Sequence, residues 1–379
     1  MNREPDNKGS PLLSEAQRLA WLRLIRSENV GPATFRELIN HFGSAEAALA
    51  QLPALSRRGG KQAIRVCPLH DAMEEYEAMQ RMGARLVALG EPGYPPHLRH
   101  IDGPPPLLSV TGANALSQPR AVAVVGARNA SLAGRKMAHL MAEDLSRRGY
   151  VIVSGLARGI DAAAHGASLK GGTVAVMAGG VDILYPPEHD RLLADILANG
   201  GNAVSEMPFG WKPRGRDFPR RNRLISGISL SVIVIEAAKG SGSLHTARFA
   251  LEQNRDIFAV PGSPLDPRSE GANNLIRQGA ALVTCADDVE EALAGRIEPD
   301  LPFDLDVQEP ETSGGGLPSE PSDNLRERLI MALGPTPVGI DELVRHTGES
   351  ARLIQILLLE LELAGRLERH AGQRVSLVY

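Results

Sequence analysis

The sequence has few of the residues on which several classes of protein depend. Its two cysteines, Cys67 and Cys285, lie far apart and match no metal-ligand spacing, so neither a disulfide framework nor a zinc site is expected. Aromatic residues make up 4% of the chain and hydrophobic residues 43%, so the core is expected to consist mainly of aliphatic side chains. No apolar run reaches membrane-spanning length, and residues 1–13 lack an apolar signal segment. These absences predict a cytoplasmic protein without a membrane partner.

The chain also has little net charge, -4 over 379 residues, which argues against a general binder of polyanions. The segment from Lys212 to Arg223 is an exception, because it has six basic side chains and one acid, Asp217. Arginine suits phosphate because its planar guanidinium directs several donors and stays charged. The nearby rings of Phe218 and Trp211 could stack on bases. The alternatives are a solvated basic loop, or arginines that pair with carboxylates.

Changes in composition divide the chain into six parts. Residues 86–120 are rich in proline and glycine, which indicates an extended connector with short strands. Residues 297–324 contain eight acids and no lysine or arginine, which indicates a flexible acidic linker. The predicted parts are a disordered tail (1–13), a helical domain (14–85), the connector (86–120), a Rossmann-like domain (121–296), the linker (297–324) and a winged-helix-like domain (325–379).

The first and last of the predicted domains are expected to be mostly helical. Ser14 and Gln17 are spaced as a capping box that opens the first helix. The turn Val30-Gly-Pro32 resembles that of a helix-hairpin-helix unit, in which backbone amides can meet a DNA phosphate; the alternative is a helical bundle used for packing. Three helices and a hairpin predict a winged helix at the C-terminal end. Its third helix, over 354–364, lacks the basic surface that a helix in the major groove needs, which favours a protein-interaction role.

Short apolar strands alternate with helical patterns in the central domain. Continuous apolar strands of this kind indicate a parallel sheet covered by helices on both faces. The fold class expected is therefore α/β, with a doubly wound Rossmann-like core. The expected strands are 121–125, 150–153, 173–177, 203–205, 231–235 and 256–260.

Three of these strands are followed by glycine-rich turns, at Gly126, Ser154 and Ser241, that open onto helices. Ligands of an open parallel sheet lie at the carboxyl ends of its strands, and a helix N-terminus offers free amides to an anion. Arg128 and Arg158 add full charges at two of the turns. The arginine-rich segment precedes the fifth strand and is expected at the same edge. Together these features predict a phosphate-rich ligand.

A dinucleotide cofactor is not expected, because the first turn lacks the later glycines of Gly-x-Gly-x-x-Gly and the second strand ends in Ser154 rather than an acid. A nucleotide phosphoribohydrolase resembles the chain more closely, but Phe249 stands where that family has its catalytic glutamate. Asp161 and His165 are spaced like an acid–base pair or half of a metal site. The favoured alternative is a helix-capping or buried Asp–His hydrogen bond that shapes the loop. No catalytic residue, cofactor or metal is therefore expected.

Seven short motifs between residues 90 and 295 together resemble one family. They are similar to the motifs of DNA-processing protein A (DprA, also called Smf), and the two terminal domains resemble extensions found in that family. The motifs are Val125–Arg128, Val153–His165, Ala178–Pro186, Ser205–Pro208, Phe218–Ser226, Ser241–Ala247 and Val260–Gly262.

The resemblance implies a bacterial protein that binds single-stranded DNA during natural transformation (competence) and recombination, and that is not an enzyme. It implies protection of incoming strands, loading of the RecA recombinase onto them, and a homodimer formed through the Rossmann-like domains. The DNA pocket of the family corresponds to Arg128, Phe218, Arg221 and Arg223. Ala127 departs from the family pattern, because many members have serine or threonine before the arginine, and this removes one hydroxyl contact to phosphate.

Alanine in place of Arg128 or Arg221 is expected to weaken DNA binding without unfolding the protein. Two other functions stay open at this point: a nucleotide hydrolase that uses Asp161 or Glu206 as its acid, and a scaffold whose terminal domains matter most. The residues predicted to bind DNA or phosphate are Gly126, Arg128, Arg158, Lys212, Arg214, Arg216, Phe218, Arg220, Arg221, Asn222, Arg223, Ser241, Gly242 and Ser243.

Overall fold

The computed structural model describes residues 12–61, 63–113, 115–294, 323–370 and 372–378. The predicted tail and acidic linker therefore lie almost entirely outside the described residues. The chain divides into two compact units. The first runs from Glu75 through the central part of the chain, and the second combines Leu13–Glu74 with the C-terminal part.

A sheet in the first unit confirms the predicted fold class. Among the described residues, nine strands form it in the order β1-β2-β6-β5-β4-β3-β7-β8-β9. The strands from β6 to β9 in this order run parallel, whereas β2 pairs antiparallel with both β1 and β6. The strands are β1 (Arg85–Ala88), β2 (Leu107–Gly112), β3 (Ala121–Val125), β4 (Val151–Ser154), β5 (Thr173–Val176), β6 (Asn202–Ser205), β7 (Ser231–Val234), β8 (Asp256–Ala259) and β9 (Ala281–Leu282).

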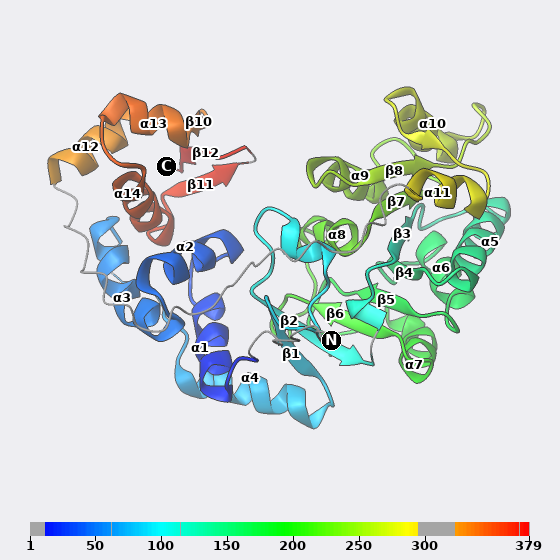
Figure 1. Ribbon diagram of the computed structural model, residues 1–379, viewed down its shortest axis with the longest axis horizontal. Helices are drawn as coiled ribbons and strands as arrows, with labels where there is room; N and C mark the ends of the chain where they lie inside the picture. The colour runs from blue at the N-terminus through cyan, green and yellow to red at the C-terminus, as the bar shows by residue number, and fades with distance from the viewer. Residues whose placement is uncertain (1–11, 62, 114, 295–322, 371, 379) are drawn as a thin grey trace, which may run out of the picture. The chain divides into compact units, whose positions relative to one another are not determined.

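Side chains of the central strands alternate between two buried layers. In β3, Ala121, Ala123 and Val125 join one apolar cluster, while Val122 and Val124 join the other. Figure 1 shows α8 and α9 on one side of β3 and β7, and α5 and α6 on the other side. This burial on both faces explains why the strands have apolar residues throughout rather than an alternating pattern. The helices are α5 (Leu132–Arg147), α6 (Ile160–Ala167), α7 (Asp190–Ala198), α8 (Asp217–Ile228), α9 (Gly242–Glu252), α10 (Glu270–Arg277) and α11 (Ala286–Leu293).

The order of the strands reverses next to β3. The chain moves outward on one side of β3 through β4, β5 and β6, and then returns to place β7 on the other side. The carboxyl ends of β3 and β7 therefore border a topological switch point, where doubly wound sheets bind their ligands.

Two segments differ from what their sequence suggested. The proline-rich residues 86–120, expected as a connector with short strands, supply β2 and most of β1 to the edge of the sheet. The arginine-rich segment around Phe218 had no predicted secondary structure, and it forms the first turns of α8. Pro219 fits there because the first turn of a helix does not need its N–H as a donor.

The second unit joins the two ends of the chain. Ser14 caps α1 with the predicted capping box, since its hydroxyl accepts from the Gln17 N–H and the Gln17 side chain accepts from the Ser14 N–H. None of the helices in the described ranges is long and apolar enough to cross a bilayer. The division between the two units falls inside α4 (Leu69–Arg81). The other elements are α1 (Glu15–Arg26), α2 (Pro32–Phe42), α3 (Ala45–Arg58), α12 (Asp323–Ala332), β10 (Val338–Gly339), α13 (Ile340–Thr347), α14 (Ala351–Leu363), β11 (Leu367–His370) and β12 (Arg374–Leu377).

Candidate nucleic-acid interface

Two adjoining cavities lie at the switch point. The larger has a volume of about 670 Å³ and is lined by the turns that follow β3, β4 and β7 and by one face of α8. The smaller, of about 40 Å³, extends toward Tyr185 and Pro186. Both cavities share Arg128, Ala157, Phe218 and Arg221 as lining residues, so these side chains stand between them. The glycine-rich turns and the arginine-rich segment, which begins α8, therefore meet at one edge of the sheet as expected.

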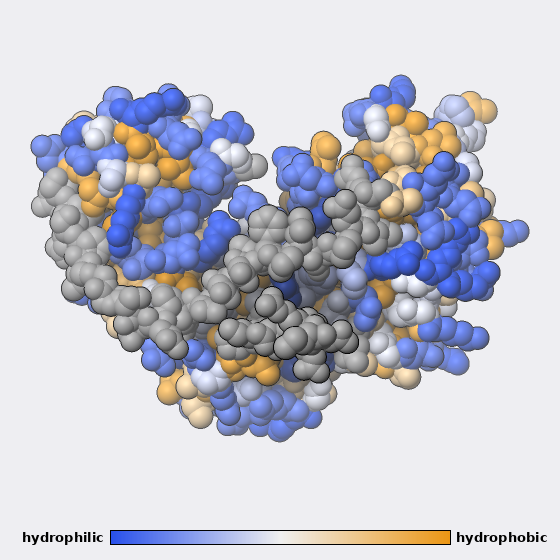
Figure 2. All heavy atoms as spheres, in the orientation of Figure 1, coloured by the Kyte–Doolittle hydropathy of each residue, from blue (hydrophilic) through white to orange (hydrophobic). Residues whose placement is uncertain are grey.

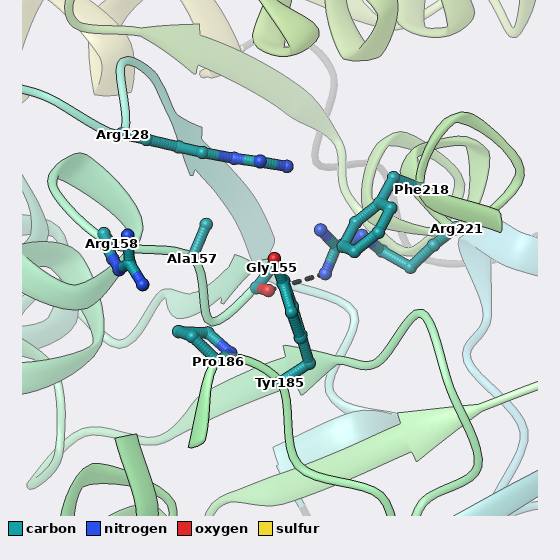
Figure 3. A pocket seen from close by; sticks show the side chains of 8 residues that line it. All are labelled: Arg128, Gly155, Ala157, Arg158, Tyr185, Pro186, Phe218 and Arg221. Atoms are coloured by element: carbon teal, nitrogen blue, oxygen red, sulfur yellow. Dashed lines mark hydrogen bonds between the residues drawn. The ribbon is translucent and has the colours of Figure 1, made fainter. Parts of the chain in front are cut away.

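Arginine and aromatic groups surround the smaller cavity, as Figure 3 shows. The Arg128 guanidinium lies 5.4 Å from the centre of the Phe218 ring, and Tyr185 meets the same ring edge to face at 5.3 Å. Arg128 is exposed, and in the part of the chain that the structure describes no carboxylate lies within ion-pair distance of it. A free guanidinium beside two accessible rings can bind a phosphate and stack a base.

Hydrogen bonds and close packing fix the turn that carries Arg128. Glu236, two residues after β7, accepts hydrogen bonds from the backbone N–H and the hydroxyl of Ser131. Gly126 lines the larger cavity, but a Cβ there would lie 2.6 Å from Ile160. Position 126 must therefore be glycine for α6 to pack closely against the turn.

Arg221 is a buried cation in the wall between the two cavities, only 7% exposed. It donates to the Gly155 carbonyl at 2.6 Å, drawn as a dashed line in Figure 3, and also to the Val176 carbonyl. A Cβ on Gly155 would lie 2.6 Å from the guanidinium, so the two residues fit only because position 155 is glycine. Burial lowers the pKa of Arg221 to about 10. At neutral pH the side chain stays charged, and the backbone carbonyls fix its position.

Asp161 and His165 each have a structural partner, but they are not hydrogen-bonded to each other as one form of the favoured alternative expected. The Asp161 carboxylate accepts from the N–H groups of Gly155 (3.1 Å) and Ala157 (3.3 Å), and so shapes the turn after β4. Burial raises the pKa of Asp161, and the nearby Arg221 opposes that rise. His165 pairs with the Thr173 hydroxyl at 2.7 Å, and burial lowers its pKa to about 3, so it is neutral. Across the described residues, no three His, Cys, Asp or Glu side chains are grouped to hold a metal.

The structure separates the predicted site residues into two groups. Nine of them line the cavities: Gly126, Arg128, Arg158, Phe218, Arg221, Asn222, Ser241, Gly242 and Ser243. Within this group, Arg158 is paired with Glu188, and α9 begins at Gly242 so that its N-terminal turn opens onto the larger cavity. The others, Lys212, Arg214, Arg216, Arg220 and Arg223, line neither cavity.

Arg220 and Arg223 pair with a carboxylate outside the cavities, which was one of the alternatives open for this segment. Both donate to the buried carboxylate of Glu206, and Arg223 also donates to the Gly103 carbonyl at 3.1 Å. They therefore hold α8 to neighbouring loops. The Glu206 carboxylate, in turn, already has two arginine partners. Arg214 stacks on Trp211 at 4.6 Å, so that ring is covered by a side chain of its own loop.

Among the cavity residues that sequence reasoning did not assign to the site are Tyr185, Lys239, His245 and Arg268. Lys239 comes shortly after β7, so its place at a strand end could have been read from the sequence. Tyr185 lay within a quoted motif but received no role. Arg268 belongs to a distant loop, pairs with Asp266, and had no sequence signal.

The switch-point cavities define a class of protein: a Rossmann-like domain whose ligand edge offers rings and guanidinium groups suited to a phosphate-bearing ligand. The family model described as DNA recombination-mediator protein A matches residues 85–294. A DprA-like N-terminal HHH domain matches residues 15–78, and a DprA winged helix domain matches residues 316–373. The chain belongs to the DNA recombination-mediator protein A (DprA/Smf) family.

Known proteins of this family are similar to the chain in sequence and structure. The protein Smf of Escherichia coli (strain K12) is 39% identical over 303 residues, which are 79% of this chain and 79% of that protein. The crystal structure of DNA processing protein A from Streptococcus pneumoniae has a TM-score of 0.60 and 32% identity, and covers 76% of this chain and all of that one. A structure of DNA processing protein A from Helicobacter pylori, titled for its single-stranded DNA binding mode, has a TM-score of 0.51 and 27% identity, and covers 56% of this chain and 96% of that one.

Proposed function

We propose that this chain binds single-stranded DNA at the switch-point cavities and acts in DNA processing for natural transformation and recombination. One observation carries the proposal: the Arg128 guanidinium, which has no ion-pair partner among the described residues, lies beside the accessible rings of Phe218 and Tyr185. A base in a duplex has both faces covered by its neighbours, so only an unstacked base can reach rings in a cavity. The name of the H. pylori structure gives single-stranded DNA as a ligand of that protein, and the S. pneumoniae relative is named for DNA processing, which supports the same ligand here.

A role as a nucleotide hydrolase has less support. The two acids considered for it both have structural partners, because Asp161 accepts from backbone amides and Glu206 from two arginines. Phe249 lies in α9 where a phosphoribohydrolase has its catalytic glutamate. Incubation with nucleoside monophosphates should release no free base, and release that depends on Asp161 would replace the DNA-binding proposal with an enzymatic one.

The partners that the family resemblance implies belong to the same proposal. If the protein loads RecA in the cytoplasm, adding it should accelerate strand exchange by RecA on DNA coated with single-strand-binding protein. The absence of any acceleration would refute loading.

A homodimer is supported by hydrophobic residues at the surface around α10 in Figure 2 and by the edge strand β9. Leu265 is 93% exposed and Leu282 on β9 is 52% exposed. Light scattering should show a dimer that Leu265→Asp weakens; a wild-type monomer at micromolar concentration would exclude it.

Salt dependence tests the main proposal. Neutralising about two to four phosphates on a single strand should make log K fall with log salt with a slope of about 1.5 to 3. Fluorescence anisotropy with labelled oligo-dT and a duplex of the same length should show this slope and at least about tenfold preference for the single strand. Affinity that does not change with salt, or equal affinity for the duplex, would contradict a phosphate-binding cavity that stacks unpaired bases.

A further inference from the structure

Helix α14 of the winged helix has buried side chains on two sides. Ile354, Leu357, Leu358 and Leu361 belong to the apolar core that the winged helix forms with α12, α13 and β11–β12. Ile356, Leu359 and Leu363 are also buried, although they lie outside that core. Their spacing of three and four residues places them on one stripe of the helix. A winged helix that stood alone would leave this second stripe exposed.

The N-terminal helices cover the second stripe, since α14 packs against α3 and α2 within the same compact unit (Figure 1). The turn of the helix-hairpin-helix element takes part. The Asn29 amide donates to the Leu363 carbonyl at 2.9 Å, and the buried Thr34 hydroxyl donates to Glu362 at 2.8 Å. The N-terminal end of α2 thus meets the C-terminal end of α14, which joins helix ends of opposite partial charge.

Polar contacts continue along this interface. The Glu360 side chain is 1% exposed and pairs with Arg326 of the winged helix at 2.9 Å, while Arg58 of α3 lies 3.8 Å from its other oxygen. Arg366 donates to the Gly59 carbonyl at 3.2 Å. Gly59 is pressed against the backbone of α14, because a Cβ there would lie 2.0 Å from the Glu360 carbonyl oxygen. Contact this close requires glycine at the end of α3.

We propose that α14 is a protein-docking helix whose partner is the N-terminal helical domain of the same chain. In a winged helix the third helix is the one that would enter the major groove. Here the outer stripe of α14 is apolar and acidic, and it is buried on α2 and α3. The acids of α14, Glu360 and Glu362, already have partners. The winged helix therefore closes the two ends of the chain into one unit and does not read duplex DNA through this helix. The inference is independent of the switch-point cavities.

Gly59→Ala in the full chain tests the docking. Gly59 has a φ of -71°, which alanine adopts freely, so in an undocked α3 the change should leave stability unchanged or raise it. If α3 is docked on α14, the change should instead lower the stability of the unit, because the new methyl group collides with the α14 backbone. Hydrogen exchange should become faster in both α3 and α14 by about tenfold or more. Gly334→Ala is the matched control, since that glycine has open space around it and no positive φ. Wild-type or slower exchange in Gly59→Ala would overturn the proposal.

Leu359→Asp gives a second variant that places a charge on the buried stripe. Docking predicts faster exchange in α2 and α3 as well as in α14. Faster exchange confined to the winged helix would refute the docking. Both variants should bind duplex DNA no more tightly than the wild type does, because the stripe that undocking uncovers is apolar and lies beside the acids Glu360 and Glu362. A tenfold gain in duplex affinity would identify α14 as a covered DNA-reading helix and overturn the proposed role.

Discussion

Replacing Arg128 and Phe218 together by alanine is expected to reduce the affinity for single-stranded DNA by about a hundredfold or more. The change removes the exposed guanidinium and the ring that separate the two cavities. A stacked base contributes about 1–3 kcal/mol, and a hydrogen bond to a charged group about 1.5–3 kcal/mol. Neither side chain belongs to the buried core, so the melting temperature should change little.

The matched control is Arg214→Ala with Arg216→Ala. This pair removes twice the positive charge from exposed positions that line neither cavity. Anisotropy titrations of both double variants with the same oligonucleotide should show less than about a tenfold loss for the control. If the control lost as much affinity as Arg128→Ala/Phe218→Ala, general electrostatic attraction would account for binding and the cavity would not.

Arg221→Ala is expected to destabilise the protein by about 3–5 kcal/mol, because removal of one member of a buried charged network leaves the others uncompensated. The variant would leave Asp161 without its nearby cation, and the carbonyls of Gly155 and Val176 without their donor. The sequence alone predicted loss of DNA binding in a folded variant. The buried position of Arg221 changes that expectation, and thermal or urea unfolding measures the difference.

The neighbouring Arg220→Ala is the control for this experiment. Arg220 is 47% exposed, and its partner Glu206 would keep Arg223. Its loss should cost no more than about 1 kcal/mol. An Arg221→Ala protein as stable as the wild type, defective only in DNA binding, would show that Arg221 is a ligand-binding residue without a structural role.

Helical geometry explains which members of the arginine-rich segment reach the site. Phe218, Arg221 and Asn222 are spaced three and four residues apart, so they share the face of α8 that lines the larger cavity. Arg220 and Arg223 point to other sides and meet Glu206. The sequence showed the apolar strands and the glycine-rich turns, and it resembled the right family. It did not show that this segment was helical, so the sequence-based pocket included Arg223, which the helix directs to Glu206 and away from the cavities.

The joining of the chain ends could not be predicted in the same way. Asn29 and Leu363 are hydrogen-bonded although they are 334 residues apart, and neither belongs to a motif that names the other. The mostly apolar character of 354–364, with two acids and no basic residue, did favour a helix with a protein partner over one that reads DNA. The identity of that partner depended on the folded chain.

Photocross-linking tests the central claim most directly. A single-stranded oligonucleotide with 5-iododeoxyuridine would be irradiated with the wild-type protein, and the linked peptides identified by mass spectrometry. A base stacked in the switch-point cavities should be linked to Phe218 or Tyr185, the two rings that line the smaller cavity. Links found only within residues 13–74 or 323–378 would contradict the account and place the DNA on the unit formed by the two chain ends.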